Sequence, residues 1–463
     1  MHHYDFLVIG SGPAGQRAAI QAAKLEKDVA IVERQPLVGG VSLHTGTIPS
    51  KTLREAVLYL TGWDQRGLYG PSYRLKQKLL IEDLMQRMDI TLRHETEVVE
   101  HQLRRNGVTL INGNASFTDS HTLHVEKSDG SYEELHAEKF LIAVGSRPAR
   151  PEGVPFDNES IVDSDGILGI KRLPHSMSVV GAGVIGVEYA SIFNAMDVKV
   201  TLIDSRPTLL NFMDREIVDE LVHQLRKRGL VLRLHEKVAR IFKDDNGHIH
   251  TELESGKRLI SETVLFAAGR IGCTYTLDLD KAGLTTDSRR RLSVNANFQT
   301  EVPHIYAAGD VIGFPSLAST SMEQGRLAAC HAMGQTAGEQ REYFPFGIYS
   351  IPEMSMIGAT EQELTEKRVA YEIGIAQLRE TARGQIMGLQ EGLLKLLVSL
   401  GDRRLLGVHI LGEGATELIH IGQAVLSMGG TLDYFLETVF NYPTLAEAYK
   451  VAALDAWNRL NTS

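Results

Sequence analysis

The chain has 463 residues, which is enough for roughly three domains. A hydrophobic fraction of 43%, a charged fraction of 23% and 43 glycines are typical of a globular protein with many tight turns. The formal net charge of −10 argues against a broad binding surface for nucleic acid or an anionic membrane, but it allows a local basic pocket for a nucleotide phosphate.

The chain has two cysteines, Cys273 and Cys330, which are too few for a disulfide framework and suit a reducing compartment. Its first residues show no basic region followed by a long apolar run, so no secretory signal is expected. Nowhere do 18 apolar residues follow one another, so no membrane span is expected. We therefore predict a soluble cytoplasmic protein.

A β-α-β pattern occurs twice, at residues 5–33 and 176–204. Each copy has an apolar β-rich run, a glycine turn, a helical stretch and a second β-rich run that ends in an acid. Short buried-strand patterns that end in Gly and Arg follow the copies, at 140–148 and 264–272, and a third strand-turn pattern lies at 304–313. The repeat predicts two doubly wound units in an α/β protein.

The first copy carries a Gly-x-Gly-x-x-Gly fingerprint at Gly10, Gly12 and Gly15, between a strand and a helix. The first glycine permits a tight turn, the second lets a pyrophosphate approach the backbone, and the third allows helix and strand to pack closely. The phosphate is then expected at the helix N-terminus, where free N–H groups favour negative charge. Glu33, 18 residues after the last glycine, is placed to bind ribose hydroxyls.

The second copy repeats this fingerprint at Gly181, Gly183 and Gly186, with Asp204 at the same spacing. Two copies in the correct frame predict two dinucleotide sites, one for a held cofactor and one for an exchangeable one; turn glycines without a ligand are the alternative. A carboxylate favours a free 2′-hydroxyl, whereas an arginine can pair with a 2′-phosphate. Asp204 with Arg206 thus indicates tolerance of both NAD and NADP, unless Arg206 is only a surface residue at a strand end.

From about residue 341 the chain has no glycine fingerprint. It contains the strand-like stretches LLKLLVSL and LLGVHILG, and it ends in a helical stretch from Ala446 to Arg459. We predict a separate α+β domain here.

Several motifs together resemble the flavoprotein pyridine nucleotide–disulfide oxidoreductase family, which includes lipoamide dehydrogenase and glutathione reductase. The resemblance covers essentially the whole chain. The matching segments are the first fingerprint, Gly39-Gly40 leading into Gly46-Thr47-Ile48-Pro49-Ser50-Lys51, Gly181–Glu188, Thr300 with Tyr306-Ala307-Ala308-Gly309-Asp310, and Pro443-Thr444-Leu445-Ala446-Glu447.

The resemblance implies bound FAD, an exchangeable NAD(P)(H) and a homodimer or a higher homo-oligomer. It implies two Rossmann-like domains, for FAD and NAD(P), and a C-terminal dimerisation domain. The expected segments are 1–150 for the first part of the FAD-binding domain, 151–275 for the NAD(P)-binding domain, 276–340 for the second, central part of the FAD-binding domain and 341–463 for the dimerisation domain.

The family also implies roles for single residues. Asp310 should accept a hydrogen bond from the flavin ribityl chain. Lys51 should lie near flavin N5 and pair with Glu188, because a lysine there supports developing negative charge. In the family, the stretch from Pro443 to Glu447 should reach the partner subunit's flavin.

The chain departs from the family's disulfide reductases at two places. Their Cys-x-x-x-x-Cys positions hold Ser42 and Thr47 here, and neither hydroxyl can form a disulfide, so dithiol exchange is excluded at this site. Their histidine before Pro-Thr, which shuttles protons for the thiols, is Tyr442 here, and this leaves the orienting role of Glu447 in doubt. We interpret Cys273 and Cys330, which lie elsewhere, as buried structural thiols.

With these departures, the chain resembles the branch of the family that transfers hydride between NADPH and NAD⁺ through FAD. One nucleotide site used in turn implies ping-pong kinetics. The alternatives are an NAD(P)H oxidase or a quinone or dye reductase of the same family, and a catalytically silent, flavin-free paralogue that acts as a subunit or regulator.

No metal site is expected. The histidines, including His44, His94, His101, His409 and His420, show no ligand spacing. His44, between the two former cysteine positions, is interpreted as a packed loop residue, with a position facing the flavin as the alternative.

Overall fold

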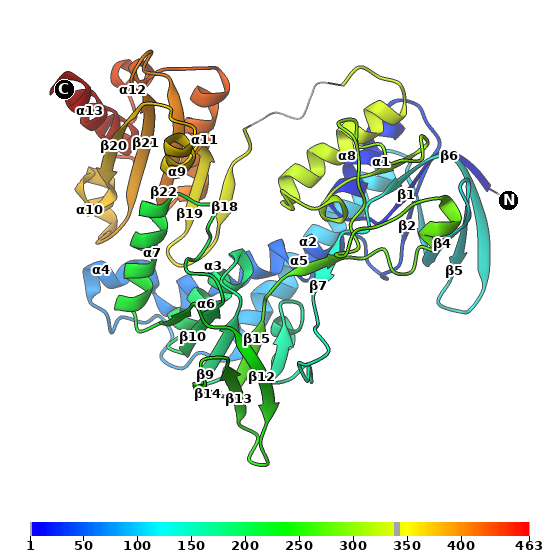
Figure 1. Cartoon of the computed structure of the whole chain (residues 1–463), viewed down its shortest axis with the longest axis horizontal. Coiled ribbons are helices and arrows are strands. Elements are labelled where there is room, and N and C mark those ends of the chain that lie inside the picture. The colour runs from blue at the N-terminus through cyan, green and yellow to red at the C-terminus, as the bar shows by residue number, and fades with distance from the viewer. Residues whose placement is uncertain (1, 338–342, 463) are drawn as a thin grey trace. The chain divides into compact units, whose positions relative to one another are not determined.

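The computed structural model describes residues 2–337 and 343–462 (Figure 1). The predicted domain boundary between residues 340 and 341 lies outside the described residues, and the division into four segments stays a prediction. Contacts within the chain define two compact units. Unit 1 consists of Met1–Thr52, Met85–Ala149 and Gly269–Gln340, and unit 2 of Leu53–Leu84, Arg150–Ala268 and Arg341–Ser463.

A seven-stranded sheet forms the centre of unit 1. Its order is β3-β2-β1-β6-β5-β4, and β17 pairs with β6. The strands β1, β2, β3, β6 and β17 run parallel, whereas β4, β5 and β6 form an antiparallel meander. The strands are β1 (His2–Ile9), β2 (Val29–Glu33), β3 (Thr109–Asn112), β4 (Asn114–Asp119), β5 (Thr122–Glu126), β6 (Tyr132–Ile142) and β17 (Ile305–Ala307).

The central strand β1 is buried on both faces, as expected for a parallel strand covered by helices. Phe6 and Val8 join the core beneath α1 and α8, whereas Leu7 and Ile9 join the core on the opposite face. The helices that lie wholly within unit 1 are α1 (Pro13–Lys24), α2 (Gly40–His44), η3 (Leu279–Ala282), η4 (Asp310–Ile312) and α8 (Ala318–Ala332).

A two-stranded ribbon lies where the chain leaves unit 1 and returns to it. Its strands β7 (Ser146–Pro148) and β16 (Arg270–Gly272) are antiparallel, with Gly272 opposite Ser146. The strand patterns predicted at 140–148 and 264–272 are confirmed, but each is divided between two strands, the end of β6 and β7 in the first and β15 and β16 in the second, because the chain turns at its glycine.

A five-stranded parallel sheet in unit 2 has the order β11-β10-β9-β15-β8. A small antiparallel sheet, β12-β13-β14, accompanies it. The elements are β8 (Ile161–Asp163), η2 (Gly166–Gly169), β9 (Ser176–Val180), α6 (Val184–Ala195), β10 (Lys199–Asp204), α7 (Arg215–Lys227), β11 (Val231–Leu234), β12 (Val238–Lys243), β13 (Ile249–Leu253), β14 (Arg258–Ser261) and β15 (Thr263–Phe266).

The C-terminal part of unit 2 is an antiparallel sheet of order β18-β19-β22-β21-β20, with α11 and α13 packed against it (Figure 1). The predicted strands and final helix are confirmed as β21, β22 and α13. The elements are β18 (Phe346–Ile348), β19 (Met354–Gly358), α9 (Glu361–Glu366), β20 (Tyr371–Gln377), η5 (Leu378–Glu380), α10 (Ala382–Met387), β21 (Leu393–Ser399), β22 (Leu405–Leu411), α11 (Ala415–Ser427), α12 (Leu432–Glu437) and α13 (Glu447–Thr462).

The remaining helices follow the first β-α-β unit. They are α3 (Thr47–Thr61), η1 (Trp63–Gln65), α4 (Arg66–Tyr69) and α5 (Ile81–Arg105). Within the part of the chain that the structure describes, no helix is both long and apolar enough to span a bilayer. The predicted fold class, two Rossmann-like units and a C-terminal α+β domain, is confirmed.

Candidate dinucleotide-binding sites

The three glycines of the first fingerprint meet three different steric demands. Gly10 has a φ of +103°, and a Cβ added there would lie 2.5 Å from the carbonyl oxygen of Ala143. A Cβ on Gly15 would lie 1.9 Å from the carbonyl oxygen of Gly10, so helix α1 can pass this close to the strand only with glycine. A Cβ on Gly12 would meet no atom within 4 Å. The side of the turn next to Gly12 is therefore open to a ligand.

The second fingerprint has the same geometry. Gly181 has a φ of +107°, and a Cβ there would lie 2.6 Å from the oxygen of Ala267. A Cβ on Gly186 would lie 1.8 Å from the oxygen of Gly181, and one on Gly183 would meet nothing within 4 Å. In both fingerprints, therefore, the first and third glycines have no room for a side chain, whereas the space next to the middle glycine is open.

Both fingerprints lead into helices whose N-termini lack side-chain caps. Gly12 and Gly183 are the capping residues of α1 and α6, and neither can offer a side-chain acceptor to the amides of the first turn. Neither helix has an acidic residue in its first turn. Free amides, the helix dipole and an open glycine fit a bound pyrophosphate, so both turns suit a dinucleotide.

Glu33 ends β2 and is held against the first glycine turn by uncharged donors. Its carboxylate accepts hydrogen bonds from Ser11 N at 2.9 Å, from Ser11 Oγ at 2.6 Å and from Gln35 N at 2.8 Å. The neighbouring Arg34 donates to the hydroxyl of Tyr275. The structure thus places the predicted ribose-binding acid beside the fingerprint.

Asp204 ends β10 in the equivalent place, but its principal partner is charged. Arg206 donates from Nε to Oδ1 at 2.9 Å and from Nη2 to Oδ2 at 2.7 Å, and Ala182 N donates to Oδ2 at 2.5 Å. Burial raises the pKa of Asp204, but the hydrogen bonds from Arg206 and Ala182 outweigh burial and hold this pKa below its usual value. Both groups are therefore ionised at neutral pH and form a bidentate pair.

Asp310, the first residue of η4, takes part in a contact that the sequence did not suggest. Ser146 Oγ donates to Asp310 Oδ2 at 2.7 Å, and Arg270 donates to Ser146 from Nε to Oγ at 2.9 Å and from Nη2 to the carbonyl oxygen at 2.8 Å. The short ribbon of β7 and β16 thus holds the side chain of Asp310. In the sequence, Ser146 and Arg270 stand out only as parts of the two segments that end in Gly and Arg, at 140–148 and 264–272.

Lys51 and Glu188 lie in different units. Lys51 is in unit 1, in the first half of α3, and its Nζ donates to Ser50 Oγ at 3.3 Å. Glu188 is buried in α6 of unit 2, and its Oε1 accepts from Tyr349 N at 2.9 Å. The predicted pairing of these two side chains stays a prediction.

The former cysteine positions carry hydroxyl groups on successive helices. Ser42 lies in α2 and Thr47 begins α3. Cys273 and Cys330 are buried and free, as predicted for structural thiols. The described part of the chain therefore holds no disulfide at which thiol exchange could take place.

Two residues near the C-terminus, Tyr442 and Glu447, were singled out in the sequence. Tyr442 is 74% exposed. Glu447 begins α13, and its Oε2 is buried without a hydrogen-bond partner in the described part of the chain. His44 lies at the end of α2 with Nε2 2.8 Å from the carbonyl oxygen of Val38, which agrees with its interpretation as a packed residue.

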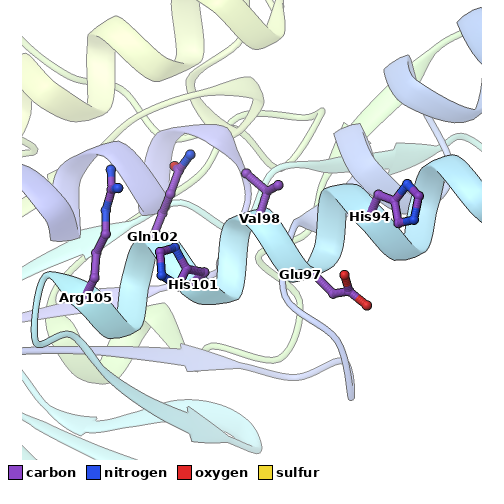
Figure 2. A pocket seen from close by; sticks show the side chains of 6 residues that line it. All are labelled: His94, Glu97, Val98, His101, Gln102 and Arg105. Atoms are coloured by element: carbon purple, nitrogen blue, oxygen red, sulfur yellow. The ribbon is translucent and has the colours of Figure 1, made fainter.

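A shallow hollow lies along one face of α5, where Figure 2 shows side chains from a single helix. No fingerprint residue lines it. His94 and His101 lie there, but neither belongs to the group of metal-type ligands that the described residues bring together. The lining residues are His94, Glu97, Val98, His101, Gln102 and Arg105.

The sequence also contains no indication of a group of acids that lies around Arg54. Arg54 Nε donates to the carbonyl oxygen of Ser350 at 3.1 Å, and its Nη2 lies 3.6 Å from Glu353 Oε2. Burial, followed by the charges of Asp64 and Glu353, raises the pKa of Glu413 to about 7.

Comparison with known families gives two matches. Residues 4–325 match the family model described as pyridine nucleotide-disulphide oxidoreductase, and residues 344–453 match the dimerisation domain of the same family. Together they span most of the chain.

Curated relatives match over nearly the full length. Proteins named soluble pyridine nucleotide transhydrogenase from Mycobacterium bovis (strain BCG / Pasteur 1173P2) and Mycobacterium tuberculosis (strain ATCC 25177 / H37Ra) are 54% identical over 461 residues, 99% of this chain and 98% of theirs. A protein of the same name from Enterobacter sp. (strain 638) is 46% identical over 463 residues, 99% of each chain.

Two solved structures have a similar fold. The HOCl-induced flavoprotein disulfide reductase RclA from Escherichia coli, in a Cu(II) complex, matches with a TM-score of 0.88 and 26% identity over 98% of this chain and 99% of its own. LpdA from Mycobacterium tuberculosis matches with a TM-score of 0.90 and 24% identity over 98% and 99% of the two chains, and supports the fold alone.

The raised pKa of Glu413 predicts a pH-dependent loss of stability. Between about pH 4.5 and 7 the unfolded chain releases this proton while the folded chain retains it, so the free energy of unfolding falls as pH rises and levels off above pH 7. Glu413→Gln should raise the free energy of unfolding by about 1–3 kcal/mol at pH 8 and by almost nothing at pH 4.5. Urea unfolding at fixed protein concentration measures this, with Glu417→Gln as the control for loss of a nearby charge. An equal gain at both pH values would contradict the assignment.

Proposed function

Because the chain belongs to the pyridine nucleotide-disulphide oxidoreductase family, we propose that it is a transhydrogenase that transfers hydride between NADPH and NAD⁺ with FAD as its cofactor. The observation that carries this proposal is the pair of open glycine turns in a chain whose two cysteine positions hold Ser42 and Thr47. The absence of thiols at these positions excludes a dithiol as the acceptor, and the motifs around Lys51 and Tyr442 favour a second dinucleotide over oxygen or a quinone. Relatives that share 54% of their residues with this chain have the matching name.

The first fingerprint is proposed to hold FAD. FAD, when bound, would supply a carrier that takes two electrons from one nucleotide and gives them to another. Gly12 and the N-terminus of α1 would bind the pyrophosphate, Glu33 the ribose, and Asp310 the ribityl chain. Ser146 would fix the carboxylate of Asp310, because it donates to Oδ2.

The second fingerprint is proposed to hold the exchangeable nucleotide. Gly183 and the N-terminus of α6 would bind its pyrophosphate, and Asp204 with Arg206 would contact the 2′ position of its adenosine ribose. One site that serves NADPH and NAD⁺ in turn gives ping-pong kinetics, with parallel double-reciprocal lines.

Lys51 is proposed as the residue that provides positive charge at the flavin ring, with Glu188 as its partner. Neither residue transfers a proton, because hydride transfer between nucleotides requires none from a side chain.

The proposed enzyme is a cytoplasmic homodimer. Its C-terminal sheet lies in the segment that matches the family's dimerisation domain, residues 344–453. The exposed Tyr442 and its neighbours would then face the second subunit.

Anaerobic spectroscopy tests the proposed function. Addition of NADPH to the purified yellow protein should bleach its visible absorption, and NAD⁺ added next should restore it with release of NADH. Oxygen consumption with NADPH alone would indicate an oxidase, bleaching reversed only by a quinone would indicate a quinone reductase, and a colourless protein would indicate a flavin-free paralogue. Each of these three results would overturn the proposal.

The pair of Asp204 and Arg206 predicts opposite effects on the two nucleotides. Arg206→Ala should raise the KM for NADPH by about 10- to 100-fold, the value of a charge-assisted phosphate contact, and change the KM for NADH little. Asp204→Asn should affect NADH more than NADPH, because it weakens the acceptor for the 2′-hydroxyl. Steady-state kinetics with each nucleotide measure this, with Arg215→Ala as the control for loss of a nearby cation. Equal losses for both nucleotides in Arg206→Ala would rule out a 2′-phosphate contact.

The contact between Ser146 and Asp310 predicts a defect in FAD binding. Ser146→Ala removes one hydrogen bond from the proposed ribityl-binding carboxylate, so the Kd for FAD should rise by about 2- to 12-fold. Titration of the deflavinated protein, followed by flavin fluorescence, gives this constant. Ser131→Ala, which loses only a hydrogen bond to Asp129 in an exposed hairpin, is the control. An unchanged Kd for FAD would exclude Ser146 as a positioning residue.

A further inference from the structure

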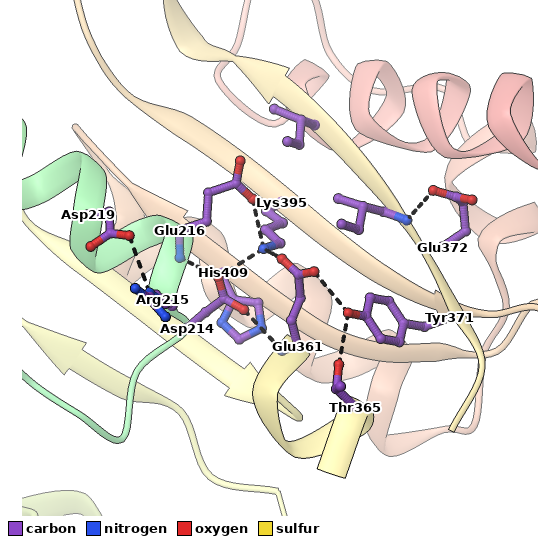
Figure 3. Close-up of polar contacts among 12 residues, drawn as sticks. Asp214, Arg215, Glu216, Asp219, Glu361, Thr365, Tyr371, Glu372, Lys395 and His409 are labelled. Carbon is purple, nitrogen blue, oxygen red and sulfur yellow. Dashed lines mark hydrogen bonds and ion pairs between the residues drawn. The ribbon is translucent and has the colours of Figure 1, made fainter. Parts of the chain in front are cut away.

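A lysine with no exposed surface lies among three carboxylates in unit 2 (Figure 3). Nζ of Lys395, on β21, lies 2.9 Å from Asp214 Oδ1 and 2.8 Å from Glu216 Oε2, and it also donates to Glu361 Oε1. We call Asp214, Glu216, Glu361 and Lys395 the carboxylate–lysine cluster. A buried ammonium ion is costly unless it is fully paired, and here each of its three hydrogens has a carboxylate acceptor.

The cluster joins the beginnings of two helices. Asp214 caps α7 by accepting from Glu216 N at 3.2 Å, and its Oδ2 accepts from Glu361 N, in the first turn of α9, at 3.1 Å. Lys395 belongs to the segment that matches the dimerisation domain, residues 344–453, whereas Asp214 and Glu216 belong to the segment that matches the other family model, residues 4–325. One ammonium ion thus fixes the start of α7 to the C-terminal sheet.

The start of α7 is also the end of a loop that begins at the second nucleotide site. Residues 205–213 connect Asp204, at the end of β10, with Asp214, and Arg206 lies near the start of this loop. Leu210 N donates to the carbonyl oxygen of Ala182 in the glycine turn, and the side chain of Leu210 is fully buried. The loop is therefore anchored at the glycine turn and at the carboxylate–lysine cluster.

We propose that Lys395 is a positioning residue for the nucleotide site, because it holds in place the loop that carries Arg206. The inference rests on the proposed function in one respect: it takes the second fingerprint as the site of NAD(P)(H). Lys395 touches no nucleotide in this scheme and acts through Asp214 and the loop of residues 205–213.

Coulomb repulsion gives the physical reason. One ligand oxygen each from Asp214, Glu216 and Glu361 lies within 4.8 Å of the other two. Without the ammonium ion these three anions repel one another, and they must separate or bind protons. Either response moves or neutralises Asp214, which loosens the cap of α7 and the end of the loop.

The same geometry suggests a specific rescue. Three carboxylates at this spacing resemble the oxygen ligands of a divalent cation. His409 borders the cluster, with its Nε2 2.9 Å from the carbonyl oxygen of Ala359 and with its buried Nδ1 lacking a hydrogen-bond partner among the described residues. If the long side chain is removed, an added cation can take the place of the ammonium charge.

The experiment measures nucleotide binding directly. In Lys395→Ala, the Kd for NADP⁺ by titration calorimetry should rise by about 2- to 30-fold, the range for mutations that act through a packed network. The turnover number per bound FAD should stay within about twofold, because the residues at the flavin are unchanged. Ca²⁺ or Mn²⁺ should restore the Kd in Lys395→Ala and leave the unmodified protein unaffected.

Two further variants keep the test informative. Asp214→Asn retains Lys395 and removes the charged partner through which Lys395 acts on the start of α7, so a smaller rise in the Kd is expected even if Lys395→Ala does not fold. Lys227→Ala is the matched control, because Lys227 pairs with Glu391 at the other end of α7, and the Kd should not change.

A lower melting temperature with an unchanged Kd in both cluster variants would show that the cluster only stabilises the fold, and would overturn the proposal. A raised Kd in Lys395→Ala that neither cation reverses would also overturn it, because charge would then not be what positions the loop. Failure of the proposed function shows up separately, as absence of NADPH-to-NAD⁺ transfer in the unmodified protein.

Discussion

The close approach of a helix to a strand at Gly15 and Gly186 is the constraint on which both candidate sites depend. In each fingerprint a Cβ added at the third glycine would lie only 1.9 or 1.8 Å from the carbonyl oxygen of the first, which is far too close for any side chain. Close packing there brings the uncapped start of the helix to the end of the strand, where the middle glycine leaves room. The positions of Glu33 and Asp204, the two acids proposed to bind ribose, follow from the same geometry because the next strand is adjacent and parallel.

The sequence was informative wherever the determinants are local. Each fingerprint lies within six residues, and its third glycine is constrained by the first glycine of the same fingerprint, so the turns, their helices and their acids were predicted. The strands of the C-terminal domain were visible as apolar runs. The antiparallel meander of β4, β5 and β6 and the long helix α5 were not predicted, because their sequences carry no motif and their burial is set by the rest of unit 1.

The contacts that the sequence did not reveal join residues far apart in the chain. Ser146 lies 164 residues from Asp310, and Lys395 lies 181 residues from Asp214. Such a pairing is fixed by the topology of the sheets, so no spacing between the two residues in the sequence predicts it. One signal was present: a lysine within the apolar run LLKLLVSL, where a buried charge requires partners from elsewhere.

Glu33 and Asp204 differ in the hydrogen-bond donors that surround them. This difference fits the proposed roles of the two sites, one for bound FAD and one for the exchangeable nucleotide. Glu33 accepts hydrogen bonds from the neutral donors Ser11 and Gln35, which suits the proposed contact with the ribose of one ligand that stays bound. Asp204 already shares its charge with Arg206. A 2′-phosphate can pair with the guanidinium of Arg206 in place of Asp204. A 2′-hydroxyl can instead donate to the carboxylate of Asp204 while Asp204 stays paired with Arg206. When a 2′-phosphate binds, Asp204 would keep the hydrogen bonds from Ala182 N and Arg206 N, so its carboxylate would have donors with either nucleotide at this single site.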